Sequence, residues 1–195
     1  MQRLIVGISG ASGSIYGIRL LEVLRDTDIE THLILTEAGR TVAEVETGYT
    51  GAQIEALADK AYRNDDLAAA ISSGSFITMG MVVAPCSIKS LSAIARSQSD
   101  TLLVRAADVM LKERRKLVLV VRETPLHLGH LRLMEAVTEF GAVVLPPAPG
   151  FYHQPKTVAD IVDHTVAKVL DQFGLDRDLF PRWPEGAVRP TSKEG

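Results

Sequence analysis

The sequence predicts a three-layer α/β fold of the Rossmann or flavodoxin-like type, in which helices cover both faces of a mostly parallel sheet. Segments typical of strands alternate along the chain with segments of helical periodicity. The strand segments are apolar throughout, as expected for strands buried on both faces. The 195 residues fit one domain with a sizeable core. We therefore expect a single domain over residues 1–195, with a C-terminal tail over 174–195.

The first strand, turn and helix form the most distinctive stretch of the sequence. Four apolar residues at 4–6 and 8 lead into a loop at 9–14 made only of Gly, Ser and Ala, and a helical pattern follows to about Leu24. Small loop residues and the unpaired N–H groups of a helix start favour an anion or an electron-rich cofactor edge. The loop matches neither the dinucleotide fingerprint nor a Walker loop. A tight turn without a ligand remains the alternative.

The remaining elements follow in the same alternation. We expect strand 29–35, helices 37–46 and 53–61, strand 80–84, helices 88–95 and 102–114, strand 117–121, helix 128–140, strand 142–145 and a last helix running to about Phe173. Thr157 is the expected N-cap of that last helix, with Asp160 as its capping-box partner. Residues 146–155 contain too many prolines for regular structure.

Polar side chains stand where four of the predicted strands end. They are the segment Ser9 to Ser12, Thr36, Ser87 and the pair Arg122-Glu123. Because the carboxyl ends of parallel strands share one edge of a sheet, these residues are expected to converge there, where α/β proteins bind ligands. Hydroxyl groups suit phosphate and polar ring edges, and an arginine offers a bidentate, charge-assisted donor.

Composition excludes several classes of function. The net charge of −3 and the single dense basic run at 112–116 do not indicate a nucleic-acid partner. One cysteine, Cys86, excludes internal disulfides and multi-cysteine zinc sites, and the five histidines have no metal-ligand spacing. Cys86 is either a reactive thiol at a strand end or a buried small apolar residue. No leader or membrane span is evident, so we expect a cytoplasmic protein without a metal.

With these residues in view, the sequence resembles the flavin prenyltransferases of the UbiX type, together with their relatives beside phenolic-acid decarboxylases. Nine matching stretches cover the chain nearly end to end. They begin at Gly7 (GISGASG), Val45 (VET), Ser72 (SSGSF), Pro85 (PCSIKS), Arg105 (RAADV), Leu111 (LKERR), Val121 (VRETP), Pro149 (PGFYH) and Arg182 (RW).

The resemblance implies a reaction, its cofactor and its partners. A dimethylallyl group passes from dimethylallyl monophosphate to N5 and then C6 of reduced FMN, without a metal. The prenylated FMN is delivered to a UbiD-type decarboxylase. The family assembles as a homo-dodecamer with sites between subunits, so some residues are expected to act across subunits. Whether the decarboxylase serves quinone biosynthesis or aromatic-acid breakdown is not readable from the sequence.

The resemblance also assigns residues to roles, position by position. The expected FMN contacts are Gly10, Ala11, Ser12, Thr36, Ser87, Ile88, Lys89, Ser90, Arg105 and Arg122. The expected contacts of dimethylallyl phosphate are Lys112, Arg122, Glu123, Tyr152 and Lys168. The expected catalytic set is Ser12, Glu46, Lys112, Glu123 and Trp183.

Simple chemistry agrees with these roles. Several cations would stabilise the charge that develops on the leaving phosphate, and an aromatic face would shield an allyl cation from water. The proton lost from C6 needs a base, and either Glu46 or the released phosphate is suitable. Lys168 stands where the family usually has Arg, which keeps the charge but loses the planar fork. Thr36 replaces the common Ser and keeps its hydroxyl.

Two other functions remain open from sequence alone. A flavin-dependent peptidyl-cysteine decarboxylase is built on the same fold, but it would need a histidine after the helix at 37–46 and a Pro-Ala-Ser-Ala-Asn-type motif. This chain has Glu46 and Pro85-Cys-Ser in those places. An FMN-binding subunit or carrier of an aromatic-acid decarboxylase complex would keep the FMN residues. The phosphate-shell residues disfavour that carrier.

Overall fold

A six-stranded parallel sheet forms the centre of the molecule. The computed structural model of the protein describes residues 2–182. The strand order is β3-β2-β1-β4-β5-β6, and every paired strand is parallel. The elements are β1 Gln2–Ile8, α1 Ser14–Arg25, β2 Ile29–Leu35, α2 Glu37–Thr47, α3 Gly51–Glu55, β3 Lys60–Tyr62, the short 3₁₀ helix η1 Ala70–Ser72, β4 Gly80–Cys86, α4 Ile88–Ala95, α5 Leu102–Lys112, β5 Lys116–Val121, α6 Leu128–Glu139, β6 Val143–Val144 and α7 Val158–Asp171.

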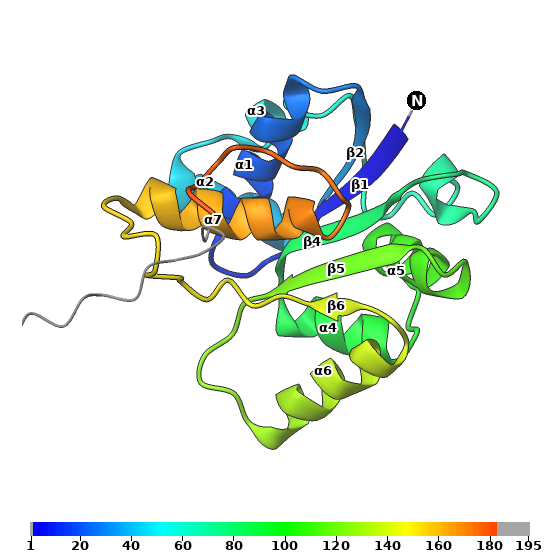
Figure 1. Cartoon of the computed structure of the whole chain (residues 1–195). Coiled ribbons are helices and arrows are strands. Elements are labelled where there is room, and N and C mark those ends of the chain that lie inside the picture. Colours follow the sequence, from blue (N-terminus) through cyan, green and yellow to red (C-terminus); the bar gives the residue numbers. More distant parts are fainter. Residues whose placement is uncertain (1, 183–195) are drawn as a thin grey trace, which may run out of the picture.

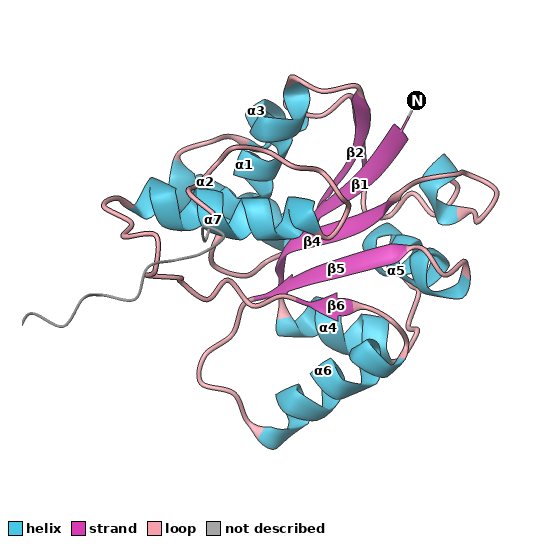
Figure 2. Ribbon diagram, in the orientation of Figure 1, coloured by secondary structure: helices cyan, strands magenta, loops and turns pink. Residues whose placement is uncertain are grey.

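This strand order confirms the predicted fold class. Order 3-2-1-4-5-6 is that of doubly wound Rossmann-type sheets, and the chain reverses its direction of winding between β1 and β4. Helices α1, α2, α3 and α7 lie on one face of the sheet and α4, α5 and α6 on the other (Figure 1). Each strand is followed along the chain by one or two helices (Figure 2). The switch point between β1 and β4 is where such sheets bind ligands.

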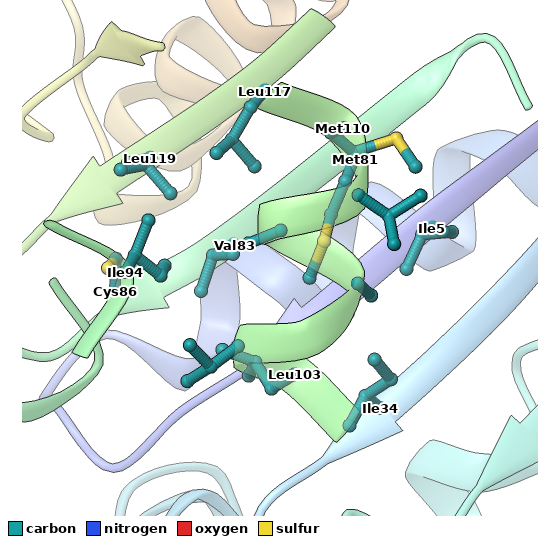
Figure 3. Close-up of a cluster of buried hydrophobic side chains, with 14 of the residues drawn as sticks. Ile5, Ile34, Met81, Val83, Cys86, Ile94, Leu103, Met110, Leu117 and Leu119 are labelled. Atoms are coloured by element: carbon teal, nitrogen blue, oxygen red, sulfur yellow. The ribbon is translucent and has the colours of Figure 1, made fainter. Parts of the chain in front are cut away.

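Two apolar clusters, one on each face, hold the three layers together. Ile5, Met81 and Leu117 of three adjacent strands pack with Leu103 and Met110 of α5 (Figure 3). The intervening strand residues face α1 and α7 instead, because successive side chains of a strand point to opposite faces. Each large side chain buried in this way contributes about 1.5–3 kcal/mol of transfer free energy. Both strand faces are therefore apolar, as the unbroken apolar runs predicted.

Most predicted elements are confirmed, and one is wrong. The strand at 29–35 and the helix at 88–95 have the predicted bounds, and Thr157 and Asp160 form the predicted capping box. The helix expected at 53–61 ends at Glu55 and is followed by the edge strand β3.

Contacts with β2 explain that edge strand. The Asp59 carboxylate accepts hydrogen bonds from the backbone N–H of Thr31 (2.7 Å) and from its hydroxyl (2.9 Å). Lys60 then pairs with the buried Glu30 of β2. These long-range contacts override the weak helical pattern of so short a segment.

Within residues 2–182, no helix has both the length and the apolar character needed to cross a membrane.

Candidate functional site

The carboxyl ends of the central strands are bonded directly to one another. The backbone N–H of Thr36, just after β2, donates to the carbonyl of Ile8 (3.1 Å). The Ser9 hydroxyl donates to the Pro85 carbonyl (2.8 Å) and accepts from the Ser87 N–H (2.8 Å). Ser9 is 1% exposed. Its two hydrogen bonds join the end of β1 to the end of β4. The predicted convergence of polar strand ends at one edge is confirmed.

A cavity of about 830 Å³ opens at this edge, and predicted ligand-binding residues line it. A cavity of this size is typical of sites for cofactors and drug-sized ligands. Polar residues of the segment that follows β2 also line the cavity, as do residues of the first turn of α5. The residues that line it at the strand ends are Ser9, Gly10, Leu35, Thr36, Ser87, Ile88, Lys89, Ser90 and Glu123.

Two helices begin at the wall of this cavity. Ser87 is the N-cap of α4, and its hydroxyl accepts from the Ser90 N–H (3.2 Å). Thr36 is the N-cap of α2, and its hydroxyl accepts from the Gly39 N–H (3.0 Å). The partial positive charge of both helix starts, with the lysine at position 89, favours an anion in this part of the cavity. The chemistry of this wall fits a phosphate group.

The start of α1 differs, because a carboxylate of the chain already occupies it. Glu46, near the end of α2, accepts hydrogen bonds from the backbone N–H groups of Gly13 (2.8 Å) and Ser14 (3.2 Å). Burial raises the pKa of Glu46, but hydrogen bonds from Ser12, Gly13 and Ser14 and the charge of Arg122 outweigh it, so this pKa lies below its usual value. The start of α1, where the loop predicted an anion or an electron-rich cofactor edge, is therefore occupied by the side chain of Glu46.

Two glycines shape this loop. Gly13 has φ 97°, a left-handed conformation that side chains disfavour. A Cβ at Gly10 would lie 2.4 Å from the Cβ of Ala38, so only glycine lets the loop approach α2 closely. The same loop carries Ser12, whose hydroxyl is hydrogen-bonded to the Glu46 carboxylate of α2.

Arg122 links the cavity to the α1 corner. Its backbone N–H donates to the Cys86 carbonyl (3.1 Å), which places it after the paired ends of β4 and β5. Its charge lowers the pKa values of Glu46 and Tyr16, although burial is the larger influence on Tyr16 and leaves that pKa raised. The Tyr16 hydroxyl also bonds with Thr165 of α7. Tyr16 and Thr165 are thus neighbours of the site that the sequence reasoning missed.

A second group of polar and aromatic residues lies where the proline-rich segment meets α7. The Tyr152 hydroxyl lies 3.1 Å from Nε2 of His164. The His153 and His164 rings stack with centroids 4.8 Å apart, and Phe180 packs edge-on against His164. One turn further along α7, the Lys168 amine lies 3.3 Å from the Asp171 carboxylate. Lys168 is therefore part of α7, and Tyr152 is hydrogen-bonded to the same helix. Both residues are predicted phosphate contacts.

Arg105 and Lys112 lie elsewhere, against the loop at 72–76. Arg105 donates to the Ser72 carbonyl (3.1 Å), and Lys112 pairs with Glu113 beside Gly74. Lys112 precedes β5 whereas Glu123 follows it, and a strand of that length separates its two ends by roughly 20 Å. One chain therefore does not bring Lys112 together with Glu123.

Two other sequence-based expectations have different outcomes. Cys86 is fully buried, and burial raises the pKa of its thiol to about 12, so it is a core residue and not a reactive thiol. Trp183, predicted as a catalytic residue, lies outside the described residues.

The chain is similar to known flavoproteins along nearly its whole length. The family model described as Flavoprotein matches residues 1–170. "Flavin prenyltransferase UbiX" of Escherichia coli strain K12 is 61% identical over 186 residues, which are 94% of this chain and 98% of that protein. The chain belongs to the flavin prenyltransferase family. That membership removes the peptidyl-cysteine decarboxylase alternative.

Solved structures of family members agree. The chain superposes with a TM-score of 0.93 on AnUbiX (PadA1) in complex with FMN and dimethylallyl pyrophosphate, at 46% identity, covering 94% of this chain and 98% of that one. It superposes with a TM-score of 0.92 on a dodecameric FMN-dependent Ubix-like decarboxylase from E. coli O157:H7, at 50% identity, covering 94% and 100%. Shared fold and shared sequence thus extend over the entire cavity-bearing part of the chain.

Sequence reasoning missed His164 as well as Tyr16 and Thr165. It treated isolated histidines as structural, because five histidines without metal spacing give no further signal. The available signal was helical spacing: His164 and Lys168 are four residues apart on α7 and so share a face. Tyr152 contacts this face through His164.

Proposed function

We propose that the protein is a flavin prenyltransferase that joins the dimethylallyl group of dimethylallyl monophosphate to N5 and then to C6 of reduced FMN. The observation that carries this proposal is the strand-end cavity, in a chain 46% identical to a protein crystallised with FMN and dimethylallyl pyrophosphate. FMN supplies the nucleophilic ring, and the residues of the chain bind, orient and exclude water.

The phosphate of FMN belongs at the starts of α4 and α2. There Ser87 and Thr36 cap two helices whose first residues line the cavity, and Lys89 adds a charge. Gly10, another predicted FMN contact, lines the same cavity and leads along the chain to Ser12, which bonds with Glu46. With the phosphate at the starts of α4 and α2, we expect the flavin ring to lie beside Ser12 and Glu46.

Glu46 orients Ser12 and contributes a fixed negative charge beside the ring. Backbone amides and the charge of Arg122 stabilise its ionised form, so it is a weaker proton acceptor than an ordinary carboxylate. This favours the released phosphate as the base that removes the C6 proton. The proton then leaves on the phosphate that Arg122 and its neighbours hold.

In this proposal, charged and polar side chains from two copies of the chain surround the phosphate of the prenyl donor. Arg122 and Glu123 stand at the end of β5, and Tyr152 and Lys168 stand on and beside α7. Lys112, the last residue of α5, lies near the start of β5 and so is too far from Glu123 to join them within one chain; we assign it, with Arg105, to a second copy. A homo-dodecamer like that of the E. coli O157:H7 relative provides such a copy.

The test is to incubate the protein with reduced FMN and dimethylallyl monophosphate and to measure the mass of the extracted flavin. We expect a flavin heavier by one dimethylallyl unit, formed only when the reductant is present. A parallel reaction with dimethylallyl pyrophosphate shows which phosphate is preferred. FMN recovered unchanged from every reaction would instead support the carrier function.

The product has a defined destination in this proposal. Prenylated FMN is the cofactor of UbiD-type decarboxylases, so such an enzyme is the partner that receives it. The reaction requires reduced FMN, and the reducing cytoplasm provides it. Activity of an added apo-decarboxylase that depends on this protein would test the transfer.

A further inference from the structure

The Tyr152 hydroxyl stands on an irregular and exposed segment, yet it is held in one place. Tyr152 lies between β6 and α7, where the chain has neither helix nor strand, and is 47% exposed. Its hydroxyl nevertheless lies 3.1 Å from Nε2 of His164, on the adjacent helix. A tyrosine on such a segment would otherwise sample several rotamers.

The His164 ring is itself fixed by its surroundings. It is 8% exposed, His153 stacks on it with an angle of 12° between the rings, and Phe180 packs edge-on with centroids 4.7 Å apart. A Cβ at Gly150 would lie 3.0 Å from Cε1 of His164, so the proline-rich segment closes the remaining side. The imidazole therefore presents Nε2 to Tyr152 in one orientation.

The hydrogen-bond inventory favours one tautomer of this ring. Burial lowers the pKa of His164, and the charges of His153 and Lys168 lower it further against the opposing charge of Asp171, which favours the neutral ring. Nδ1 is buried and has no hydrogen-bond partner among residues 2–182. An orphaned N–H is costlier than an orphaned lone pair, so the proton belongs on Nε2. Nε2–H then donates to the Tyr152 oxygen.

We infer that His164 is a positioning residue whose Nε2–H holds the Tyr152 oxygen, so that the hydroxyl proton of Tyr152 points to the phosphate of the prenyl donor. This inference rests on the proposed function, because it uses the proposed role of Tyr152. It also explains why Lys168 shares the α7 face with His164: one helix then orients two contacts of the same phosphate.

The experiment is a double-mutant cycle between Tyr152→Phe and His164→Leu in the full-length, FMN-loaded protein. Two quantities are measured: the KM and kcat for dimethylallyl monophosphate, and its Kd for the oxidised, unreactive protein by calorimetry. We expect each single variant to raise Kd and KM about 10-fold, with a smaller change in kcat. The double variant should be no worse than the worse single variant, because His164 acts through Tyr152.

Rescue separates positioning from packing. His164→Gln places an amide N–H close to the position of Nε2 and should recover most of the affinity. His164→Asn places its amide near Nδ1 and should not recover it. The two amides are similar in polarity but differ by one methylene, so the thermal stability of each variant is compared to separate packing from hydrogen bonding. Thermal unfolding is measured for each variant to show that the variant is folded. If His164→Leu does not fold, the His164→Gln and His164→Asn variants replace it in the double-mutant cycle.

Three outcomes would overturn the inference. Multiplying effects in the double variant, or equal behaviour of the Gln and Asn variants, would show that His164 does not act through Tyr152, while the proposed reaction would stand. An unchanged Kd in Tyr152→Phe would remove Tyr152 from the phosphate contacts and His164 with it. Failure of the wild-type protein to prenylate FMN would overturn the proposed function instead.

Discussion

The starts of α1 and α4 follow equivalent strands, β1 and β4, yet they do opposite things. At α1, the carboxylate of Glu46 satisfies the N–H groups of Gly13 and Ser14. At α4, the cap is the neutral hydroxyl of Ser87, and the helix start faces the cavity. The comparison teaches that a glycine-rich loop before a helix does not by itself mark an anion site. What matters is whether a carboxylate of the protein already accepts hydrogen bonds from the first N–H groups of the helix.

Removing the internal anion is expected to have the largest effect. Glu46→Ala should lower the rate of flavin prenylation about 10²- to 10³-fold, because Ser12 loses its partner beside the flavin. It should also lower the free energy of unfolding by about 1–2 kcal/mol, because two N–H groups of α1 lose their acceptor. Glu46→Gln, which keeps an acceptor oxygen, is the matched control for stability. Bound FMN should remain in both variants, and a wild-type rate in either would show that Glu46 has no catalytic role.

The next largest effect concerns Lys168, which in our proposal contacts the donor phosphate and not the start of α1 or α4. Lys168→Ala should weaken the use of dimethylallyl monophosphate about 10²-fold and leave FMN binding unchanged. Lys168→Arg should be tolerated, since the charge is kept and the planar fork is gained. Titrations of the donor with both variants test this. An unaltered titration for Lys168→Ala would remove this lysine from the phosphate contacts.

The open helix start of α4 is tested by Ser87→Ala. Loss of the cap should cost about 1 kcal/mol of stability and weaken FMN binding about 10-fold, because α4 loses a hydroxyl at the phosphate end of the cavity. Thr157→Ala removes a comparable cap from α7, which does not line the cavity. It should lower stability to a similar extent and leave FMN affinity unchanged. Equal FMN affinity in the two variants would contradict the placement of the phosphate at α4.

Acid should affect the two helix starts unequally. The pKa of Glu46 is lower in the folded protein than its usual 4.5, so its contribution to stability is present above that pH and is lost as pH falls through the folded pKa. The neutral cap of α4 does not titrate. Stability of the wild type should therefore fall more steeply below pH 4.5 than that of Glu46→Gln. The difference should be well under the limit of about 1.4 kcal/mol per pH unit for one proton, because the carboxylate is partly exposed.

The smallest expected effect is that of a chelator. Helix starts and cationic side chains supply the positive charge at both phosphates in our proposal, so excess EDTA should leave the rate of prenylation unchanged. Product formation with and without EDTA, in protein first passed over a chelating resin, measures this. Loss of activity that added Mg²⁺ restores would contradict the metal-free proposal.

The sequence predicted the features that follow from local patterns and from the general geometry of parallel sheets. The bounds of α4, the capping box at Thr157 and the convergence of Thr36 with Ser87 all follow from periodicity, caps and the geometry of parallel sheets. It mispredicted β3, because only pairing with β2 distinguishes that edge strand from a helix end.

Parts of the candidate site were beyond prediction from the sequence for the same reason. Glu46 meets Gly13 across 33 positions of the sequence, and Tyr152 meets His164 across 12. Their residue types give no sign of these pairings. The resemblance named Glu46 and Tyr152. It did not show that the Glu46 carboxylate accepts hydrogen bonds at the start of α1, or that the Tyr152 hydroxyl is hydrogen-bonded to His164.

The occupied start of α1 has a consequence for cofactor choice. Proteins with this strand order commonly bind the pyrophosphate of a dinucleotide at the helix that follows the first strand. Here such a pyrophosphate would meet the ionised Glu46 at the same two N–H groups, and two anions cannot share them. We therefore expect the chain to bind nicotinamide and flavin dinucleotides more weakly than FMN, whose single phosphate is proposed to bind at the starts of α4 and α2.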